Sequence, residues 1–249
     1  MPFTFSHPAV VLPFKYFPDR WRSMTGLIIG SMAPDFEKFI RMSAHDSFSH
    51  TWRSIFYFNL PLSLVLAFLF HIVVRDVLID HLPAYFQKRL IRFRGFDWVS
   101  HFRNHYLVII LSIIIGTLSH IAWDAFTHMD GRVVRWLPFL KAYLSVGEFR
   151  MKIFAFLQLS NSVLGLLVVL YAYYLLPVLP VKSQKVRTSE KLRYWISFTL
   201  VGCAIGILRY VFGHHLSYLI NFIVVSISAG LLSLAITSSL FKQRSYLQH

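Results

Sequence analysis

Charged side chains are scarce in this sequence. Asp, Glu, Lys and Arg make up 14% of the 249 residues, whereas soluble domains carry about 25%. Hydrophobic residues reach 56% and aromatic residues 17%. This balance excludes a soluble globular domain, because polar residues are too few and too confined to loops. We therefore expect an integral membrane protein.

Acidic residues are the scarcer of the two charge types. The chain has 11 Asp and Glu against 25 Lys and Arg, for a net charge of +14. The basic residues lie mainly between apolar runs, as in the stretch 88–94, and anionic lipid headgroups favour that pattern. A nucleic-acid-binding protein would gather them on one face of a recognisable module. The lipid bilayer is the expected partner, and nucleic acid is not.

Cysteine is nearly absent, and the opening residues show no pattern of a cleavable leader sequence. Cys203 is the only cysteine, which excludes an intrachain disulfide and argues against a thiolate metal site. The opening 21 residues contain four prolines and lack the basic, apolar and small-residue order of a cleavable signal. We expect them to remain in the mature protein.

Long apolar runs, in contrast, are abundant. A spanning helix needs about 20 mainly apolar residues, and five windows qualify: 55–74, 106–128, 153–179, 194–212 and 216–241. A shorter run at 24–34 suits a re-entrant or interfacial helix. The predicted fold is an all-α, polytopic membrane helical bundle with about five transmembrane helices plus short re-entrant or interfacial helices.

The organisation is expected to be one integral membrane domain over residues 1–249, because no linker rich in Gly, Ser or Pro divides the apolar runs. Residues 75–105 resemble an amphipathic surface segment, with Tyr85 and Trp98 at headgroup level. Lys and Arg are balanced between the two sides, so the positive-inside rule does not decide the orientation. The missing signal favours a cytoplasmic N-terminus.

The second span ends in a row of ionisable residues, His120, Asp124 and His128. Their spacing of four places all three on one helix face. Ionisable groups within spans are costly and indicate function. His120 and Asp124 can share an ion, and the second oxygen of Asp124 can bridge towards another. Imidazole and carboxylate ligands suit zinc or a similar divalent ion, and the alternative is a hydrogen-bonded structural relay.

If the first two spans are antiparallel neighbours, the start of the first and the end of the second lie on the same side of the membrane. His50, just before the first span, is then close to that row. The short run at 24–34 delivers Asp35 and Glu37 to a membrane boundary, and His7 lies near the start of the chain. We therefore expect a polar pocket with His7, Asp35, His50, His120, Asp124 and His128. The alternatives are that His7 is an ordinary loop residue and that Asp35 is a helix N-cap.

Five sequence motifs resemble the bacterial membrane family named domain of unknown function 4184. They are the opening MPFTFSHP, GSMAPDFE at 30–37, FSHT at 48–51, LSHIAWDAFTH at 118–128 followed by Asp130 and Gly131, and QLSNSVLG at 158–165. The resemblance covers most of residues 1–180, the family core with the metal site. Residues 181–249 would form a C-terminal two-helix membrane hairpin.

That family is similar in motif order to membrane-bound metal-dependent hydrolases of the bacterial inner membrane, and more remotely to zinc-dependent phospholipase C and the S1/P1 nucleases. Their shared plan implies five metal ligands here: His7, Asp35, His50, His120 and Asp124. The later His-x-x-x-Glu or His-x-x-x-Asp pair and the amino-terminal Trp ligand of the soluble enzymes are missing, and His128 could supply one further ligand. The resemblance therefore implies a mononuclear or dinuclear site.

The resulting hypothesis is a multi-pass protein of the bacterial inner (cytoplasmic) membrane that hydrolyses a phosphoester or lipid-like substrate with a divalent metal, zinc being favoured. His128 and Glu37 are the catalytic candidates, Asp130 a supporting residue, and Arg53 or Arg132 candidates for holding a phosphate. The alternative is a metal or ion carrier, or a scaffold with a structural His and Asp cluster. The sequence does not indicate an oligomeric state.

Overall fold

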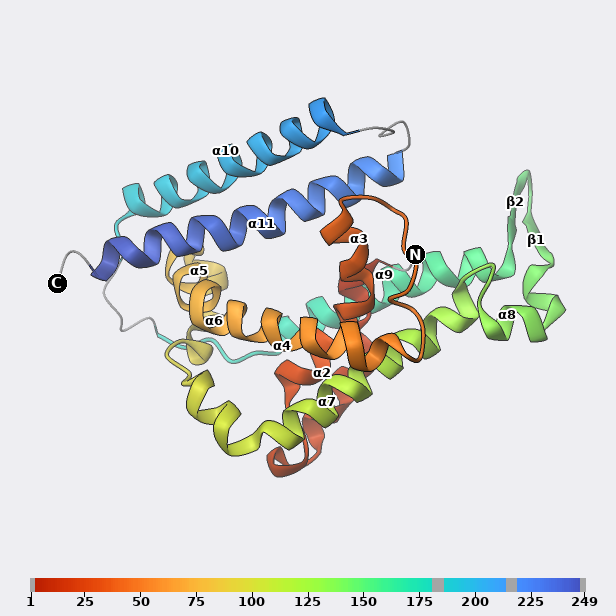
Figure 1. Cartoon of the computed structure of the whole chain (residues 1–249), viewed down its shortest axis with the longest axis horizontal. Coiled ribbons are helices and arrows are strands. Elements are labelled where there is room, and N and C mark those ends of the chain that lie inside the picture. Colours follow the sequence, from red (N-terminus) through yellow and green to blue (C-terminus); the bar gives the residue numbers. More distant parts are fainter. Residues whose placement is uncertain (1–2, 181–185, 214–218, 247–249) are drawn as a thin grey trace. The chain divides into compact units, whose positions relative to one another are not determined.

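The structure is a computed structural model that describes residues 3–180, 186–213 and 219–246 (Figure 1). In this described part, five helices are long and apolar enough to cross a membrane: Ile55–His81, Trp98–Trp136, Ile153–Tyr174, Thr188–Phe212 and Leu219–Gln243. Each overlaps one predicted window, so the prediction of an all-α polytopic bundle is confirmed. The predicted start of the fifth window, at residue 216, lies outside the described residues.

The chain divides into two compact units. Unit 1 comprises Met1–Asp35, Phe48–Leu64 and Asn104–Leu175, and unit 2 comprises Phe36–Ser47, Val65–Arg103 and Leu176–His249. The first two spanning helices contribute to both units. In the second of these, α7 (Trp98–Thr127), the helical backbone is interrupted at His105, with φ −134° and ψ 22°. This interruption lies next to the division between the units.

Unit 1 begins with a series of short helices, and one of them, α2, packs against α7. They are η1 (Thr4–Ser6), α1 (Pro8–Val11), η2 (Leu12–Tyr16), η3 (Asp19–Trp21), α2 (Met24–Met32) and η4 (Ala33–Asp35). Glycines allow α2 to approach α7 closely: a Cβ at Gly30 would overlap the carbonyl oxygen of Ile113, and one at Gly116 would overlap that of Leu27. The predicted short helix at 24–34 is therefore present, held against the second span by its backbone.

The start of the chain also packs on the third spanning helix, α9 (Ile153–Tyr174). The backbone N–H of Phe3 donates to Ser162 Oγ at 2.9 Å. A Cβ at Gly165 would come within 2.8 Å of the Ser6 carbonyl oxygen. The motif at 158–165 thus provides a docking surface for the segment that carries His7.

The connection between the second and third spans contains structure that the sequence did not predict. It consists of α8 (Arg132–Trp136), η8 (Pro138–Lys141) and a hairpin of β1 (Tyr143–Val146) and β2 (Phe149–Lys152). The strands are antiparallel, with Tyr143 opposite Lys152 and Ser145 opposite Arg150. Gly147, with φ 59°, lies in the turn, where its positive φ carries no steric cost.

Unit 2 contains α3 (Phe36–Arg41), α5 (Arg75–His81), α6 (Ala84–Leu90), η7 (Ile91–Phe93), α10 (Thr188–Phe212) and α11 (Leu219–Tyr246). The last two helices run side by side (Figure 1). Ser233 Oγ donates to the Phe198 carbonyl at 2.5 Å, and the hydroxyls of Tyr194 and Ser238 are 3.0 Å apart. Hydroxyl contacts of this kind tie membrane helices together.

The amphipathic surface segment predicted at 75–105 is only partly confirmed. Tyr85 is 61% exposed on α6, as expected for a headgroup-level residue. Trp98, however, is 2% exposed, and its ring stacks on His71 with centroids 4.4 Å apart. The prediction for Trp98 is wrong because its indole packs inside unit 2 between neighbouring aromatic side chains.

Candidate metal centre

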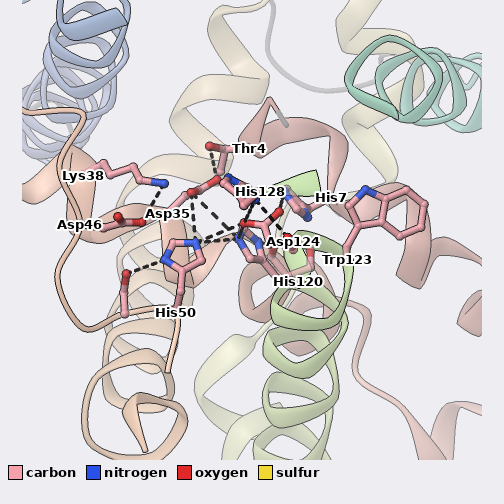
Figure 2. A network of polar contacts seen from close by, with 12 residues as sticks. Thr4, His7, Asp35, Lys38, Asp46, His50, His120, Trp123, Asp124 and His128 are labelled. Atoms are coloured by element: carbon pink, nitrogen blue, oxygen red, sulfur yellow. Dashed lines mark hydrogen bonds and ion pairs between the residues drawn. The ribbon is translucent and has the colours of Figure 1, made fainter. Parts of the chain in front are cut away.

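Six of the predicted site residues converge in unit 1 (Figure 2). His7 lies between η1 and α1, and Asp35 is the last residue of η4. His50 precedes the first span, and α7 carries His120 and Asp124 one turn apart. The sixth, His128, directly follows α7. Residues from four segments of the sequence therefore meet in unit 1.

Three ligand atoms form a nearly equilateral triangle at the centre of this cluster. His50 Nε2 and His120 Nε2 are 3.2 Å apart. Asp124 Oδ2 lies 3.4 Å from His50 Nε2 and 3.4 Å from His120 Nε2. Tetrahedral zinc with ligands at about 2.0–2.1 Å requires ligand atoms about 3.3–3.4 Å apart. The triangle matches three corners of such a site.

Hydrogen bonds at Nδ1, the ring nitrogen outside the triangle, orient both imidazoles. His120 Nδ1 is 2.7 Å from the carbonyl oxygen of Ser31, and a carbonyl only accepts, so Nδ1 carries the proton and Nε2 presents its lone pair. His50 Nδ1 is 3.0 Å from Ser49 Oγ. Metal-binding histidines are usually held in this way by an outer partner. The arrangement therefore fits neutral histidine ligands.

A second group of ligand atoms comes from His7, Asp35 and His120, which are all buried. Asp35 Oδ1 lies 3.6 Å from His50 Nε2 and 4.0 Å from His120 Nε2, while its Oδ2 accepts a hydrogen bond from Thr4 Oγ1 at 2.7 Å. Asp35 thus faces the same space as the triangle. The burial of Thr4, 2% exposed, makes it a fixed support for that carboxylate.

His7 is buried beside this triangle. It is 2% exposed, its ring stacks on His120 with centroids 3.8 Å apart, and neither of its ring nitrogens has a hydrogen-bond partner. Burial, and then the proximity of His120, lowers the pKa of His7 to about 3. Its Nε2 lies 3.7 Å from Asp124 Oδ1. A buried imidazole without a hydrogen bond is costly, and a metal ion would satisfy it.

Asp124 is the hub of the cluster. It is 6% exposed, and all its ionic partners within the described residues are histidines: His7, His50, His120 and His128. Neither of its oxygens makes a hydrogen bond. A buried carboxylate needs a compensating charge, and a divalent cation between Asp124 and the imidazoles would provide one.

The cluster is most accessible at His50 and His128, whose side chains are 24% and 26% exposed. His128 Nδ1 is 3.7 Å from Asp124 Oδ2 and 3.2 Å from the Asp124 carbonyl oxygen. This places His128 at the rim, beside the carboxylate of the triangle. In that position it suits proton transfer at the entrance better than a central ligand role.

Glu37 belongs to unit 2, where its Oε1 accepts from Arg41 Nε at 2.8 Å and from the N–H and hydroxyl of Ser47 at 3.0 and 2.8 Å. These contacts tie the loop after α3 to the helix. The catalytic role of Glu37 stays a prediction. Asp130 is exposed and belongs to unit 1.

Three further residues support the cluster: Thr4, Ser31 and Ser49. Ser49 is notable in the sequence because it directly precedes His50, and Thr4 stands three positions before His7 in the opening motif, so adjacency to a candidate ligand is the available signal. Ser31 acts through its backbone carbonyl. A backbone contact of that kind cannot be predicted from a pattern of side chains in the sequence.

Comparison with known proteins agrees with the sequence resemblance. Residues 1–239 match the family model described as Domain of unknown function (DUF4184). Among curated proteins and solved structures, none matches the chain. The match covers all six clustered residues and all five candidate spans almost to their end. The chain belongs to the DUF4184 family.

Proposed function

We propose that this protein is a membrane-embedded, metal-dependent hydrolase that acts on a phosphoester at the membrane surface. The observation that carries the proposal is the triangle of His50 Nε2, His120 Nε2 and Asp124 Oδ2, with sides of 3.2, 3.4 and 3.4 Å. Three protein ligands and one open position are typical of catalytic rather than structural zinc. Zinc is the metal that we favour for this donor set.

The chemistry follows from the donor set. A divalent ion held by these residues would lower the pKa of a bound water and stabilise negative charge on phosphoryl oxygens. Asp35, whose Oδ1 faces both histidines of the triangle, is available as a fourth ligand or as the acceptor that orients the water. His128, at the accessible rim, is placed to protonate the leaving oxygen.

Arg132 is the better placed of the two arginines suggested for phosphate binding. Its guanidinium lies 5.4 Å from the ring centre of Trp52, and Trp52 follows His50 by two residues. Stacking on an aromatic ring orients a guanidinium while leaving its N–H donors free for a phosphate. Arg132 therefore stands beside the rim formed by His50 and His128, where a phosphoryl group would enter.

A structural metal site is the alternative. The burial of His7 and Asp35, 2% and 1% exposed, favours it, because closed and fully liganded sites stabilise a fold rather than bind substrate. In that case the same cluster would hold a metal with no exchangeable position. The protein would then act as a scaffold or carrier.

Metal analysis of the full chain purified in detergent tests the proposal. We expect stoichiometric zinc in wild type and its loss in His120→Ala and Asp124→Ala, with His45→Ala, an exposed histidine of unit 2, as the matched control. Zinc-free wild type, or full zinc in both cluster variants, would refute the metal centre. Hydrolysis of phosphomonoester and phosphodiester substrates by the zinc-loaded protein then separates the hydrolase from the structural alternative, which predicts none.

A further inference from the structure

The connection between α7 and α9 has an unusual surface. Large apolar side chains are exposed along it: Met129 63%, Trp136 77%, Leu137 41%, Phe139 59% and Tyr143 53%. Residues 129–152 also contain five basic residues, Arg132, Arg135, Lys141, Arg150 and Lys152, against two acidic ones, Asp130 and Glu148. Exposed aromatic residues mixed with cations are typical of the headgroup layer of a bilayer.

The two faces of the hairpin at the end of this connection carry different side chains. Tyr143 and Ser145 are paired with Lys152 and Arg150, and directly paired residues lie on one face. The Arg150 guanidinium is 4.3 Å from the centre of the Tyr143 ring, and Lys152 Nζ is 5.9 Å from it. One face therefore presents two cations around one aromatic ring.

The opposite face of the hairpin carries the pair Leu144 and Met151, since successive residues of a strand alternate in direction. Leu144 is 36% exposed. An isolated two-stranded hairpin is at best marginally stable in water. With one apolar and one basic face, this hairpin is suited to the boundary between hydrocarbon and headgroups.

The position of the connection also fits a bilayer surface. It joins two helices that are long and apolar enough to span a membrane, and Figure 1 shows the hairpin beyond the ends of α7 and α9. The part of α7 after the interruption at His105, residues 106–127, measures about 33 Å, close to the roughly 30 Å of hydrocarbon. The connection begins directly after His128, at the accessible rim of the cluster.

We infer that residues 129–152 form an anionic-phospholipid-binding element, which holds lipid phosphates in the headgroup layer beside the metal centre. Arg150 and Lys152 bind the phosphates, while Trp136 and Tyr143 anchor the element at the interface. Resting on the proposed function, the inference makes phospholipid the substrate class, because these phosphates are the phosphoesters that lie next to the open rim.

Fluorescence quenching of Trp136 in nanodiscs tests the lipid-binding element without any need for activity. The full chain is reconstituted with brominated phosphatidylglycerol or brominated phosphatidylcholine, and the signal of Trp136 is obtained by subtracting that of Trp136→Phe. We expect quenching by both lipids, with at least a roughly fivefold preference for the anionic one, since each cation near the surface contributes about that factor.

The variant Arg150→Glu with Lys152→Glu should lose this preference, whereas the charge-preserving Arg150→Lys with Lys152→Arg should keep it. Absence of Trp136 quenching, equal quenching by both lipids, or an unchanged preference in the Glu variant would overturn the inference. Zinc content is measured in the same samples. Lost zinc with retained lipid preference counts against the proposed function alone, and the reverse result counts against the lipid-binding element alone.

Discussion

Replacing Gly30 by Ala should weaken metal binding without touching a ligand. A Cβ at this position would overlap the carbonyl oxygen of Ile113 in α7, so α2 must move away by on the order of 1 Å to restore van der Waals contact. The bond between His120 Nδ1 and the Ser31 carbonyl, now 2.7 Å, would lengthen to beyond the range of a hydrogen bond. His120 would lose its fixed tautomer and orientation.

The magnitude follows from two known effects. Loss of an outer partner of a metal-binding histidine typically lowers affinity by about 10- to 100-fold, and overpacking of a close helix contact costs about 1–3 kcal/mol of stability. We expect zinc affinity, measured by competition with a chelator, to fall within that range in Gly30→Ala. The unfolding temperature should also fall.

Gly206→Ala provides the matched control for this experiment. Gly206 lies within α10, and a Cβ there would meet no atom within 4 Å. Alanine has the higher helix propensity at an open position, so zinc affinity should be unchanged and stability unchanged or higher. If folded Gly30→Ala binds zinc as tightly as wild type, close packing of α2 on α7 does not position His120, and the reasoning fails.

Three further predictions concern the surroundings of the cluster. Thr4→Val should lower zinc affinity about tenfold while Thr4→Ser retains it, because the hydroxyl supports Asp35; titration calorimetry checks both, and equal affinities would contradict the role. Because the pKa of His7 is lowered to about 3 in the folded state, the metal-free protein should lose up to about 1.4 kcal/mol of stability per pH unit from this group as pH falls from 6.5 towards 3. Melting curves of His7→Gln should show a shallower decline, and an identical decline would argue against a buried neutral imidazole. Arg132→Ala should raise KM for a phosphoester with zinc content unchanged, and an unaltered KM would remove Arg132 from substrate binding.

The spans and the residues at the centre of the cluster were predictable because both leave strong signals in a single sequence. Apolar runs of spanning length are rare outside membrane proteins. His120 and Asp124 stood out because ionisable groups inside a span are costly. His50 followed from connectivity, since antiparallel neighbours bring the start of the first span to the end of the second.

The error at Trp98 and the omissions have a different physical origin. Glu37 stays a prediction, since it belongs to another unit than Asp35 and its carboxylate accepts from the backbone N–H of Ser47. The hairpin at 143–152 was missed because strands of four residues are too short for a reliable alternation of polar and apolar residues. Trp98 was assigned by residue type, whereas packing against His71 decided its position.

Backbone contacts account for motifs whose side chains carry no chemistry. Gly30 and Gly116 have no functional group, but they let α2 lie close enough for the Ser31 carbonyl to reach His120. Ser162 and Gly165 dock the segment that carries His7 on α9. The geometry of the cluster therefore depends on these positions as well as on the His and Asp residues that form it. A variant such as Gly165→Leu should disturb His7 from a distance, and unchanged zinc affinity in that variant would show that His7 is not held in place by α9.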